Sequence, residues 1–127
     1  MRKGWNFFLT ALLAAFFLGL LASASFARNK ASSSSGQALV KSKGCLSCHT
    51  TTGQPLVGPS YKGIYGKKVT VMVKGRPEVK TVDEKYLKFM IKNPGVWVVK
   101  GYQPDMPKIP LTEGQIDDII AYIKTLK

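Results

Sequence analysis

The sequence predicts a small all-α fold of three main helices with a short β-hairpin insertion. Three segments match the capping box, in which a Ser or Thr is followed three residues later by Glu or Gln, and apolar residues follow each at helical spacing. These capping boxes start at Ser34, Thr81 and Thr112. Between the first two, apolar and polar residues alternate over 69–73, which is the period of a β-strand. A chain of 127 residues has room for one such domain after any leader.

Residues 1–27 have the organisation of a secretory signal peptide. Arg2 and Lys3 form a positively charged start, and an uncharged, largely apolar stretch covers 7–22. Small residues at 25 and 27 predict cleavage after Ala27, with 22–24 as a second candidate.

An uncleaved membrane anchor is the alternative for this segment. Residues 7–24 carry no charge and number 18, the lower limit for a helix that spans a bilayer, so 5–24 could hold the chain at a membrane. Both interpretations export the rest of the chain. We therefore expect a periplasmic or otherwise exported protein, either soluble after cleavage near Ala27 or anchored to the inner membrane.

The segment after the leader is expected to be a linker followed by one domain. Residues 28–35 are rich in Ser and lack an apolar pattern, which predicts a Ser-rich linker and leaves 36–127 as the folded part. We expect the first helix over 36–43, continuing through the cysteines to His49. A loop with Gly and Pro follows, and 60–66 favours a short helix.

The hairpin and the second helix come next. Strands are expected over 69–73 and 79–82, joined by a turn at 75–77, as a small surface excursion. The capping box at Thr81 then predicts a helix, which Asn93-Pro94-Gly95 ends.

A structured loop over 96–109 leads to the last helix. That helix is expected after Thr112, with Gln115 completing its capping box. Its apolar face repeats Ile at helical spacing, at Ile116, Ile119, Ile120 and Ile123.

The motif that carries chemistry is Cys45-Leu46-Ser47-Cys48-His49. It contains both cysteines and the only histidine of the chain. C-x-x-C-H is the attachment signature of c-type haem, in which two thiols add to the haem vinyl groups and the histidine becomes an axial ligand of the iron. On one helical turn Cys45 and Cys48 point the same way, so both can reach one porphyrin edge.

Other chemistry for the two cysteines fits less well. A zinc site would need two more Cys or His ligands, and the chain has none. A redox dithiol of the thioredoxin type would follow a βαβ pattern, which is absent before Cys45. A disulfide between residues three apart would close too small a loop to stabilise much. The sequence therefore predicts one covalent haem c and its iron, around which the three helices pack.

The second axial ligand must be Met, Lys, Tyr, water or a partner's residue, because no second histidine exists. Met90 falls on the apolar face of a predicted helix, where packing explains it, and Met72 lies in the hairpin close in sequence to His49. Met106 lies between Pro104 and Pro107, in a loop that these prolines stiffen. We therefore expect His49 and Met106 as the two ligands.

These motifs together resemble a monohaem class I cytochrome c over about residues 35 to 127. The resemblance is carried by Gly44-Cys45-x-x-Cys48-His49, Val57-Gly58-Pro59, Tyr102-x-x-x-Met106-Pro107 and Ile120-Ala121-Tyr122-Ile123. The hairpin, Asn93-Pro94 and 100–104 are similar to the cytochrome c domain of subunit II of caa-type cytochrome oxidases and to the monohaem subunit of alternative complex III. This chain has no copper-binding domain, so it would be the haem module alone.

The resemblance implies further site residues. The Pro59 carbonyl would accept a hydrogen bond from Nδ1 of His49, although Gly58-Pro59 could also be only a turn. Gly36 on the first helix would meet Tyr122 on the last. Tyr65, Trp97 and Tyr102 are candidates to line the haem pocket or bond the propionates, with plain core packing as the alternative.

Charge indicates the kind of partner. Of the 19 Lys and Arg residues, Arg2 and Lys3 lie in the leader, which leaves 17 against 7 acidic residues. Nucleic acid is not expected for an exported chain. We expect redox proteins with an acidic docking surface, such as an oxidase or a quinol-oxidising complex, with a merely solvated surface as the alternative.

The predicted function is transfer of single electrons in a respiratory chain, with no enzymatic activity. When protein ligands fill both axial positions, the iron has no position for a substrate. Two alternatives remain: a haem-bearing permanent subunit of a membrane respiratory complex, and a haem enzyme or sensor with an open sixth position.

Overall fold

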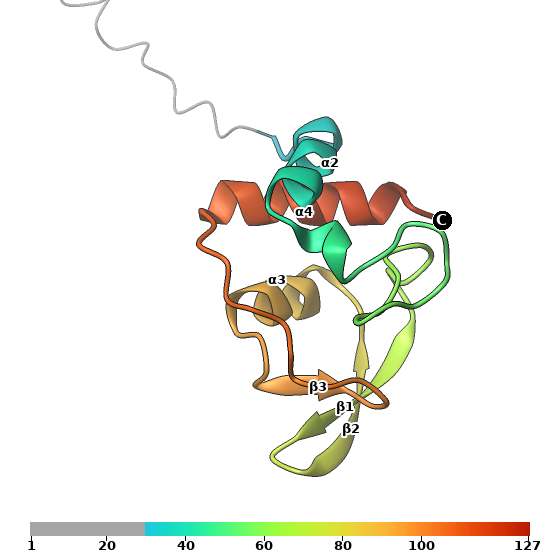
Figure 1. The fold of residues 1–127 in the computed structure, drawn as a ribbon. Helices are drawn as coiled ribbons and strands as arrows, with labels where there is room; N and C mark the ends of the chain where they lie inside the picture. The colour runs from blue at the N-terminus through green and yellow to red at the C-terminus, as the bar shows by residue number, and fades with distance from the viewer. Residues whose placement is uncertain (1–29) are drawn as a thin grey trace, which may run out of the picture.

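The computed structural model describes residues 30–127, and the prediction of three main helices with a β-hairpin is confirmed (Figure 1). The expected leader over 1–27 lies outside the described residues. The elements are α2 (Ser33–Ser42), the 3₁₀ helix η2 (Cys45–Ser47), β1 (Lys68–Val73), β2 (Arg76–Thr81), α3 (Glu84–Lys92), β3 (Trp97–Val99) and α4 (Glu113–Thr125).

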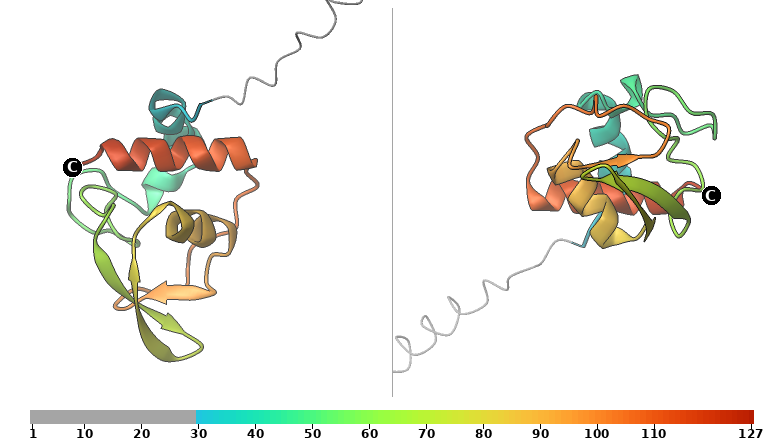
Figure 2. Two further views of the ribbon diagram at one scale, coloured as in Figure 1. Left: turned by 180° about the vertical axis from the view of Figure 1, so that it is seen from behind. Right: turned by 90° about the horizontal axis from the view of Figure 1, so that it is seen from below.

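Figures 1 and 2 show α4 running across the domain, with α2 on one side and α3 and the sheet on the other. No helix within residues 30–127 has both the length and the apolar character needed to cross a membrane.

Helix α2 begins earlier than the capping box at Ser34 predicts. Its N-cap is Ser32, whose side chain accepts a hydrogen bond from the backbone of Ser35. The backbone N–H of Ser32 donates to Oδ1 of Asp118 at 2.7 Å, which ties this end of α2 to α4. In a run of serines several residues could cap the helix, and this tertiary contact selects Ser32. The expected linker boundary at 35 is therefore too late, because 33–35 are helical.

The terminal helices cross at Gly36, as expected. A Cβ on Gly36 would overlap the backbone carbonyl of Asp118 and would lie 2.8 Å from Cβ of Tyr122. Glycine is therefore the residue that permits this close approach. Val40, one turn further along α2, is fully buried.

The expectation of one continuous helix from 36 to His49 is wrong. Helix α2 ends at Ser42, and Gly44 has the left-handed backbone conformation, with φ of 75°. A left-handed glycine after a helix redirects the chain at little cost, because glycine has no Cβ to clash. Cys45–Ser47 consequently form a separate 3₁₀ turn, η2.

The hairpin is joined by a tighter turn than expected. Val73 pairs with Arg76, so the turn is Lys74-Gly75 and the expected turn at 75–77 is one residue too late. The φ angles of Lys74 and Gly75 are 49° and 79°, both positive as a type I′ hairpin turn requires.

Strand β3 was not expected, because 96–109 reads as a loop. It pairs antiparallel with β1, giving the sheet order β2-β1-β3. Val71 of β1 pairs with Val99 and is fully buried. Strand β1 is therefore part of the core, whereas β2 is largely exposed, so the expectation of a surface excursion is wrong for β1 only. A strand of three residues has no readable period, so only the pairing with β1 reveals it.

Of the two remaining predicted helix starts, that of α3 is wrong and that of α4 is confirmed. Helix α3 is capped by Asp83, whose carboxylate accepts from the backbone of Tyr86 at 2.8 Å, whereas Thr81 is the last residue of β2. Helix α4 has the full capping box of Thr112 and Gln115, as predicted. The short helix expected over 60–66 is replaced by turns.

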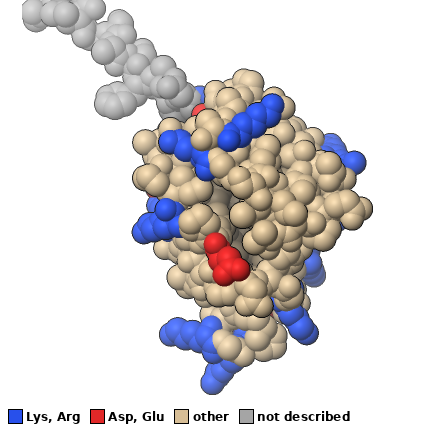
Figure 3. All heavy atoms as spheres, viewed as in Figure 1, with Lys and Arg blue, Asp and Glu red and all other residues tan. Residues whose placement is uncertain are grey.

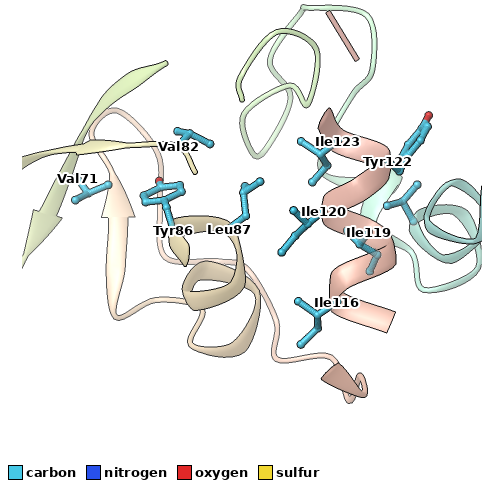
Figure 4. Close-up of a cluster of buried hydrophobic side chains, with 10 residues drawn as sticks. Val71, Val82, Tyr86, Leu87, Ile116, Ile119, Ile120, Tyr122 and Ile123 are labelled. Atoms are coloured by element: carbon cyan, nitrogen blue, oxygen red, sulfur yellow. The ribbon is translucent and has the colours of Figure 1, made fainter. Parts of the chain in front are cut away.

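The core forms where α4 meets α2, α3 and the sheet. All four isoleucines predicted for the face of α4 are buried (Figure 4). They pack with Val40, Val71, Val82, Tyr86, Leu87 and Tyr122. This cluster holds the elements that form the walls of the pocket described next.

Candidate functional site

A large pocket opens between the Cys45–His49 segment, α3 and the loop after β3. Its lining is mainly apolar and includes both cysteines, His49, Met90, Trp97 and Met106. Figure 3 shows the recess on this face of the molecule, with mostly uncharged surface around it and an acidic side chain at its edge. Residues far apart in sequence thus meet around one apolar space, which suits a large, flat, apolar ligand.

His49 is held by two segments that run side by side. The N–H of Gly58 donates to the carbonyl of Cys48 at 2.8 Å, and the N–H of Tyr61 donates to the carbonyl of Thr50 at 2.8 Å. Between these two bonds, Nδ1 of His49 donates to the carbonyl of Pro59 at 2.7 Å. The bond expected for Pro59 is therefore present, and the Gly58-Pro59 segment is more than a turn.

The hydrogen bond to Pro59 determines what His49 can do. A carbonyl only accepts, so Nδ1 carries the proton and Nε2 keeps its lone pair. Burial lowers the pKa of His49, while the bond to Pro59 acts in the opposite direction. The imidazole is therefore neutral near pH 7, which is the form that binds a metal.

Gly58 makes this arrangement possible. A Cβ on Gly58 would lie 2.5 Å from Cε1 of His49 and 2.8 Å from Nδ1. Real side-chain atoms do not approach so closely, so any larger residue would have to move the ring or the backbone that carries Pro59.

Both cysteines face the same pocket. Cys45 begins η2 and Cys48 is its C-cap, and both are half-buried free thiols among the lining residues. Burial raises the pKa of the Cys45 thiol. The expected continuous helix is thus unnecessary, because a single 3₁₀ turn brings the two thiols to one wall.

Met106 and Met90 line the pocket and Met72 does not, and of these only the place of Met90 in the lining was not expected. Met106 lines the pocket from the loop after β3, and Met72 on β1 is not among the lining residues. Met90 packs against the core, as expected, but it also lines the pocket from α3. Two thioethers therefore face the space beside His49.

Two of the three aromatic candidates lie at the pocket. Trp97 and Tyr102 line it. Tyr65 is not among the lining residues. It packs against the core, which is the alternative left open for it, and Nζ of Lys124 lies 5.2 Å from its ring centroid.

Sequence reasoning missed Tyr61. Its ring is stacked on the His49 imidazole, with centroids 4.7 Å apart and planes inclined by 15°, and it lines the pocket. Burial, more than the nearby Cys45, raises the pKa of Tyr61, so the phenol stays protonated. No local pattern indicates it, because the contact joins residues twelve positions apart in the chain.

Comparison with known proteins identifies the fold. The family model described as cytochrome c matches residues 33–127. The chain belongs to the cytochrome c family. Among solved structures, this cytochrome c is similar to cytochrome cH from Methylobacterium extorquens, with a TM-score of 0.53 and 26% sequence identity, over 74% of this chain and 98% of that one. A comparison with curated proteins found no match.

The residues of this cytochrome c fit its cofactor, haem c. An apolar pocket suits the porphyrin, and two thiols stand on its wall next to a neutral imidazole with Nε2 available. Cys45 and Cys48 are the residues able to hold haem covalently, and the bound group supplies a one-electron Fe(II)/Fe(III) couple. Membership of the cytochrome c family implies electron transfer, and members are typically carriers, not enzymes.

Proposed function

We propose that this chain is an exported monohaem cytochrome that carries single electrons in a respiratory chain, with His49 and Met106 as axial ligands of the iron. The observation that carries the proposal is that His49 and Met106 line one pocket together with Cys45 and Cys48. These four residues would supply two covalent attachments and two ligands to the haem.

The ligand pair determines the chemistry. A thioether opposite an imidazole favours ferrous iron and raises the reduction potential. With His49 and Met106 both bound to the iron, no position would be left for a substrate, and the chemistry supplied by the haem would be outer-sphere electron transfer. The work of the remaining residues is to exclude water from the pocket and to hold the imidazole by the carbonyl of Pro59.

Trp97 and Tyr102 are proposed to contact the haem from the pocket wall. Trp97 packs against the core, and its ring is tilted by 33° relative to Phe89 of α3, with ring centroids 4.0 Å apart. Tyr102 comes from the loop that carries Met106, and a half-buried phenol there has a hydroxyl to offer to a polar group.

The proposed partners are redox proteins with an acidic docking surface. Lys43, Lys62, Lys100 and Lys108 flank segments that line the pocket, and none of them takes part in an ion pair within residues 30–127. By contrast, Lys88, Lys92 and Lys124 are paired with carboxylates on α3 and α4. The unpaired positive charge near the pocket is therefore available to steer an acidic partner.

A tethered carrier is the second candidate. The uncharged stretch over 7–24 favours it, because retention of that stretch would hold the domain at a membrane as part of a respiratory complex. The resemblance of the hairpin, Asn93-Pro94 and 100–104 to the haem modules of caa-type oxidases and alternative complex III also favours it. Mass spectrometry of the mature N-terminus distinguishes cleavage after Ala27 from retention.

The test of the carrier function uses the full chain expressed with a haem-attachment system in an exporting host. We expect a pyridine haemochrome spectrum of two thioether bonds and a low-spin ferric spectrum with the weak far-red band of methionine ligation. Cys45→Ala, which leaves Cys48 in place, should shift the haemochrome band to that of a single thioether. A high-spin ferric spectrum that binds small ligands readily would contradict the carrier and favour an enzyme or sensor.

A further inference from the structure

Tyr61 is the one pocket residue in face-to-face contact with His49, and neither the motif nor the family description assigns it a role. The ring centroids are 4.7 Å apart and the planes are inclined by only 15°. We propose that Tyr61 is a positioning residue that sets the orientation of the imidazole plane of His49 about the bond from its Nε2 to the iron. This inference rests on the proposed role of His49 as a ligand.

The backbone of Tyr61 is anchored where the stack needs it. Its N–H donates to the carbonyl of Thr50 at 2.8 Å, directly after His49 in the chain. The Ser60 hydroxyl donates to the same carbonyl at 3.1 Å and accepts from the N–H of Gly53 at 3.0 Å. These bonds hold the backbone of Ser60 and Tyr61 against the segment directly after His49, so the Tyr61 side chain starts from a fixed position beside the imidazole.

The stack restrains a motion that the hydrogen bond to Pro59 leaves free. A single bond from Nδ1 at 2.7 Å fixes the direction of one ring atom, but the ring can still rotate about that direction. A parallel aromatic face resists such rotation, since tilting the imidazole would drive its edge into the Tyr61 ring. Gly58 lies against Cε1 and Nδ1 of the same imidazole and closes off part of the remaining space.

A leucine or methionine could fill the same volume without imposing a plane. Packing alone therefore does not require an aromatic residue at position 61, whereas control of ring orientation does. The hydroxyl is not needed for the stack, so phenylalanine should replace tyrosine in this role. This contrast separates the positioning role from a structural one.

The orientation of an axial imidazole has a direct spectroscopic consequence. The plane of the ligand sets which iron d orbitals interact with its π system, and the g-values of low-spin ferric haem in electron paramagnetic resonance report that interaction. A ring free to adopt several orientations gives a broadened or shifted spectrum even when both ligands stay bound.

The experiment compares four holoproteins: the unchanged chain, Tyr61→Phe, Tyr61→Leu and the control Tyr65→Leu. Tyr65 is a half-buried tyrosine four residues further on that does not line the pocket, so its removal costs similar packing away from His49. We expect Tyr61→Phe and Tyr65→Leu to keep the g-values and line widths of the unchanged protein. Tyr61→Leu should stay low-spin with shifted or broadened g-values and a changed reduction potential.

Three results would overturn the inference. These are a Tyr61→Leu spectrum identical to that of the unchanged protein, a Tyr61→Phe spectrum altered as much as that of Tyr61→Leu, or an equal change in Tyr65→Leu. If Tyr61→Leu does not load haem, Tyr61→Met replaces it under the same criteria. Failure of the assignment of His49 as a ligand, on which the inference rests, is distinguishable, because it would appear as a high-spin spectrum of the unchanged protein.

Discussion

Gly58 lies against the imidazole of His49 so closely that a Cβ on it would be 2.5 Å from Cε1 and 2.8 Å from Nδ1. The contact lets the next residue, Pro59, bring its carbonyl to within 2.7 Å of Nδ1. The absence of a side chain at position 58 is therefore a condition for the neutral imidazole whose Nε2 is free to bind iron.

Gly58→Ala should damage both stability and the redox couple. The added methyl must displace the imidazole or Pro59, and overpacking of this kind costs about 1–3 kcal/mol of unfolding free energy. A weaker hydrogen bond from Nδ1 makes the imidazole less basic, so the reduction potential should rise. Denaturant unfolding and a redox titration of the holoprotein measure the two effects.

Gly114→Ala is the matched control. Gly114 is in α4 with nothing within 4 Å of its Cβ position, so alanine should stabilise the helix by about 0.5–1 kcal/mol and leave the potential unchanged. If Gly58→Ala behaved like Gly114→Ala, the close contact with His49 would have no importance in solution.

Met106→Ala should remove the second ligand. We expect loss of the far-red band of ferric haem, entry of water or a lysine at the iron, and a substantially lower reduction potential, because the thioether favours ferrous iron. Met90→Ala is the most informative control, since Met90 also lines the pocket. It should keep the far-red band and lose about 2–5 kcal/mol of stability. Met72→Ala should keep the band as well. Loss of the band in Met90→Ala, together with its retention in Met106→Ala, would identify Met90 as the ligand.

Reversing charge near the pocket should slow electron transfer to an acidic partner. In Lys100→Glu/Lys108→Glu the bimolecular rate at low salt should fall about tenfold or more, while the spectrum and potential stay nearly unchanged. Exposed charges are screened over about 8 Å at physiological ionic strength, so the rate of the unchanged protein should fall steeply as salt is added. Stopped-flow measurement with the native partner gives both rates.

The hairpin provides a control of equal charge. Lys68 and Lys74 lie on β1 and in its turn, and neither they nor their neighbours in the chain line the pocket. Lys68→Glu/Lys74→Glu should therefore change the rate much less. Equal slowing by both double variants, or a rate that does not respond to salt, would argue against docking through the lysines near the pocket.

The contact between α3 and α4 should make stability depend on pH. A hydrogen bond from Lys92, with further attraction from Lys88, lowers the pKa of Glu113. Because this pKa is lower in the folded than in the unfolded chain, the stabilisation is present above the ordinary carboxyl pKa and is lost as the pH falls through the folded-state value. Glu113→Gln should remove this part of the acid destabilisation.

The effect of Glu113→Gln should be small, since all three side chains are exposed and such pairs are weakened by salt. Thermal unfolding at neutral and acid pH, in low and high salt, measures it. A pH dependence identical to that of the unchanged protein in low salt would show that these ion pairs do not contribute.

Local sequence patterns predicted a helix start correctly where a single helix supplies all the atoms of its capping hydrogen bonds. The Thr112 and Gln115 capping box needs only its own turn of α4, and it is present as expected. The boxes at Ser34 and Thr81 have the same local pattern, but the start of α2 is selected by the bond from Ser32 to Asp118, and Thr81 is used by β2. Strand β3 exists only through its pairing with β1, which no local pattern reveals.

In the site, too, the residues close together in the chain were predicted from the sequence, and the contacts between distant residues were not. Cys45, Cys48 and His49 lie within five residues, so the covalent chemistry of haem attachment could be read directly from the chain. The place of Tyr61 on the imidazole, the absence of Tyr65 from the pocket, and the second thioether of Met90 depend on where turns and helices pack against one another.

The sequence by itself thus determined the cofactor, the cytochrome c family and the three helices, because covalent attachment and helical periodicity are encoded by residues close together in the chain. Only the tertiary structure decided which carbonyl orients His49, which ring stacks on it and which methionines share its pocket. The physical reason is that these relations join residues 10 to 57 positions apart in the chain, from His49 to Pro59 and to Met106, and side-chain direction over such separations is set by packing.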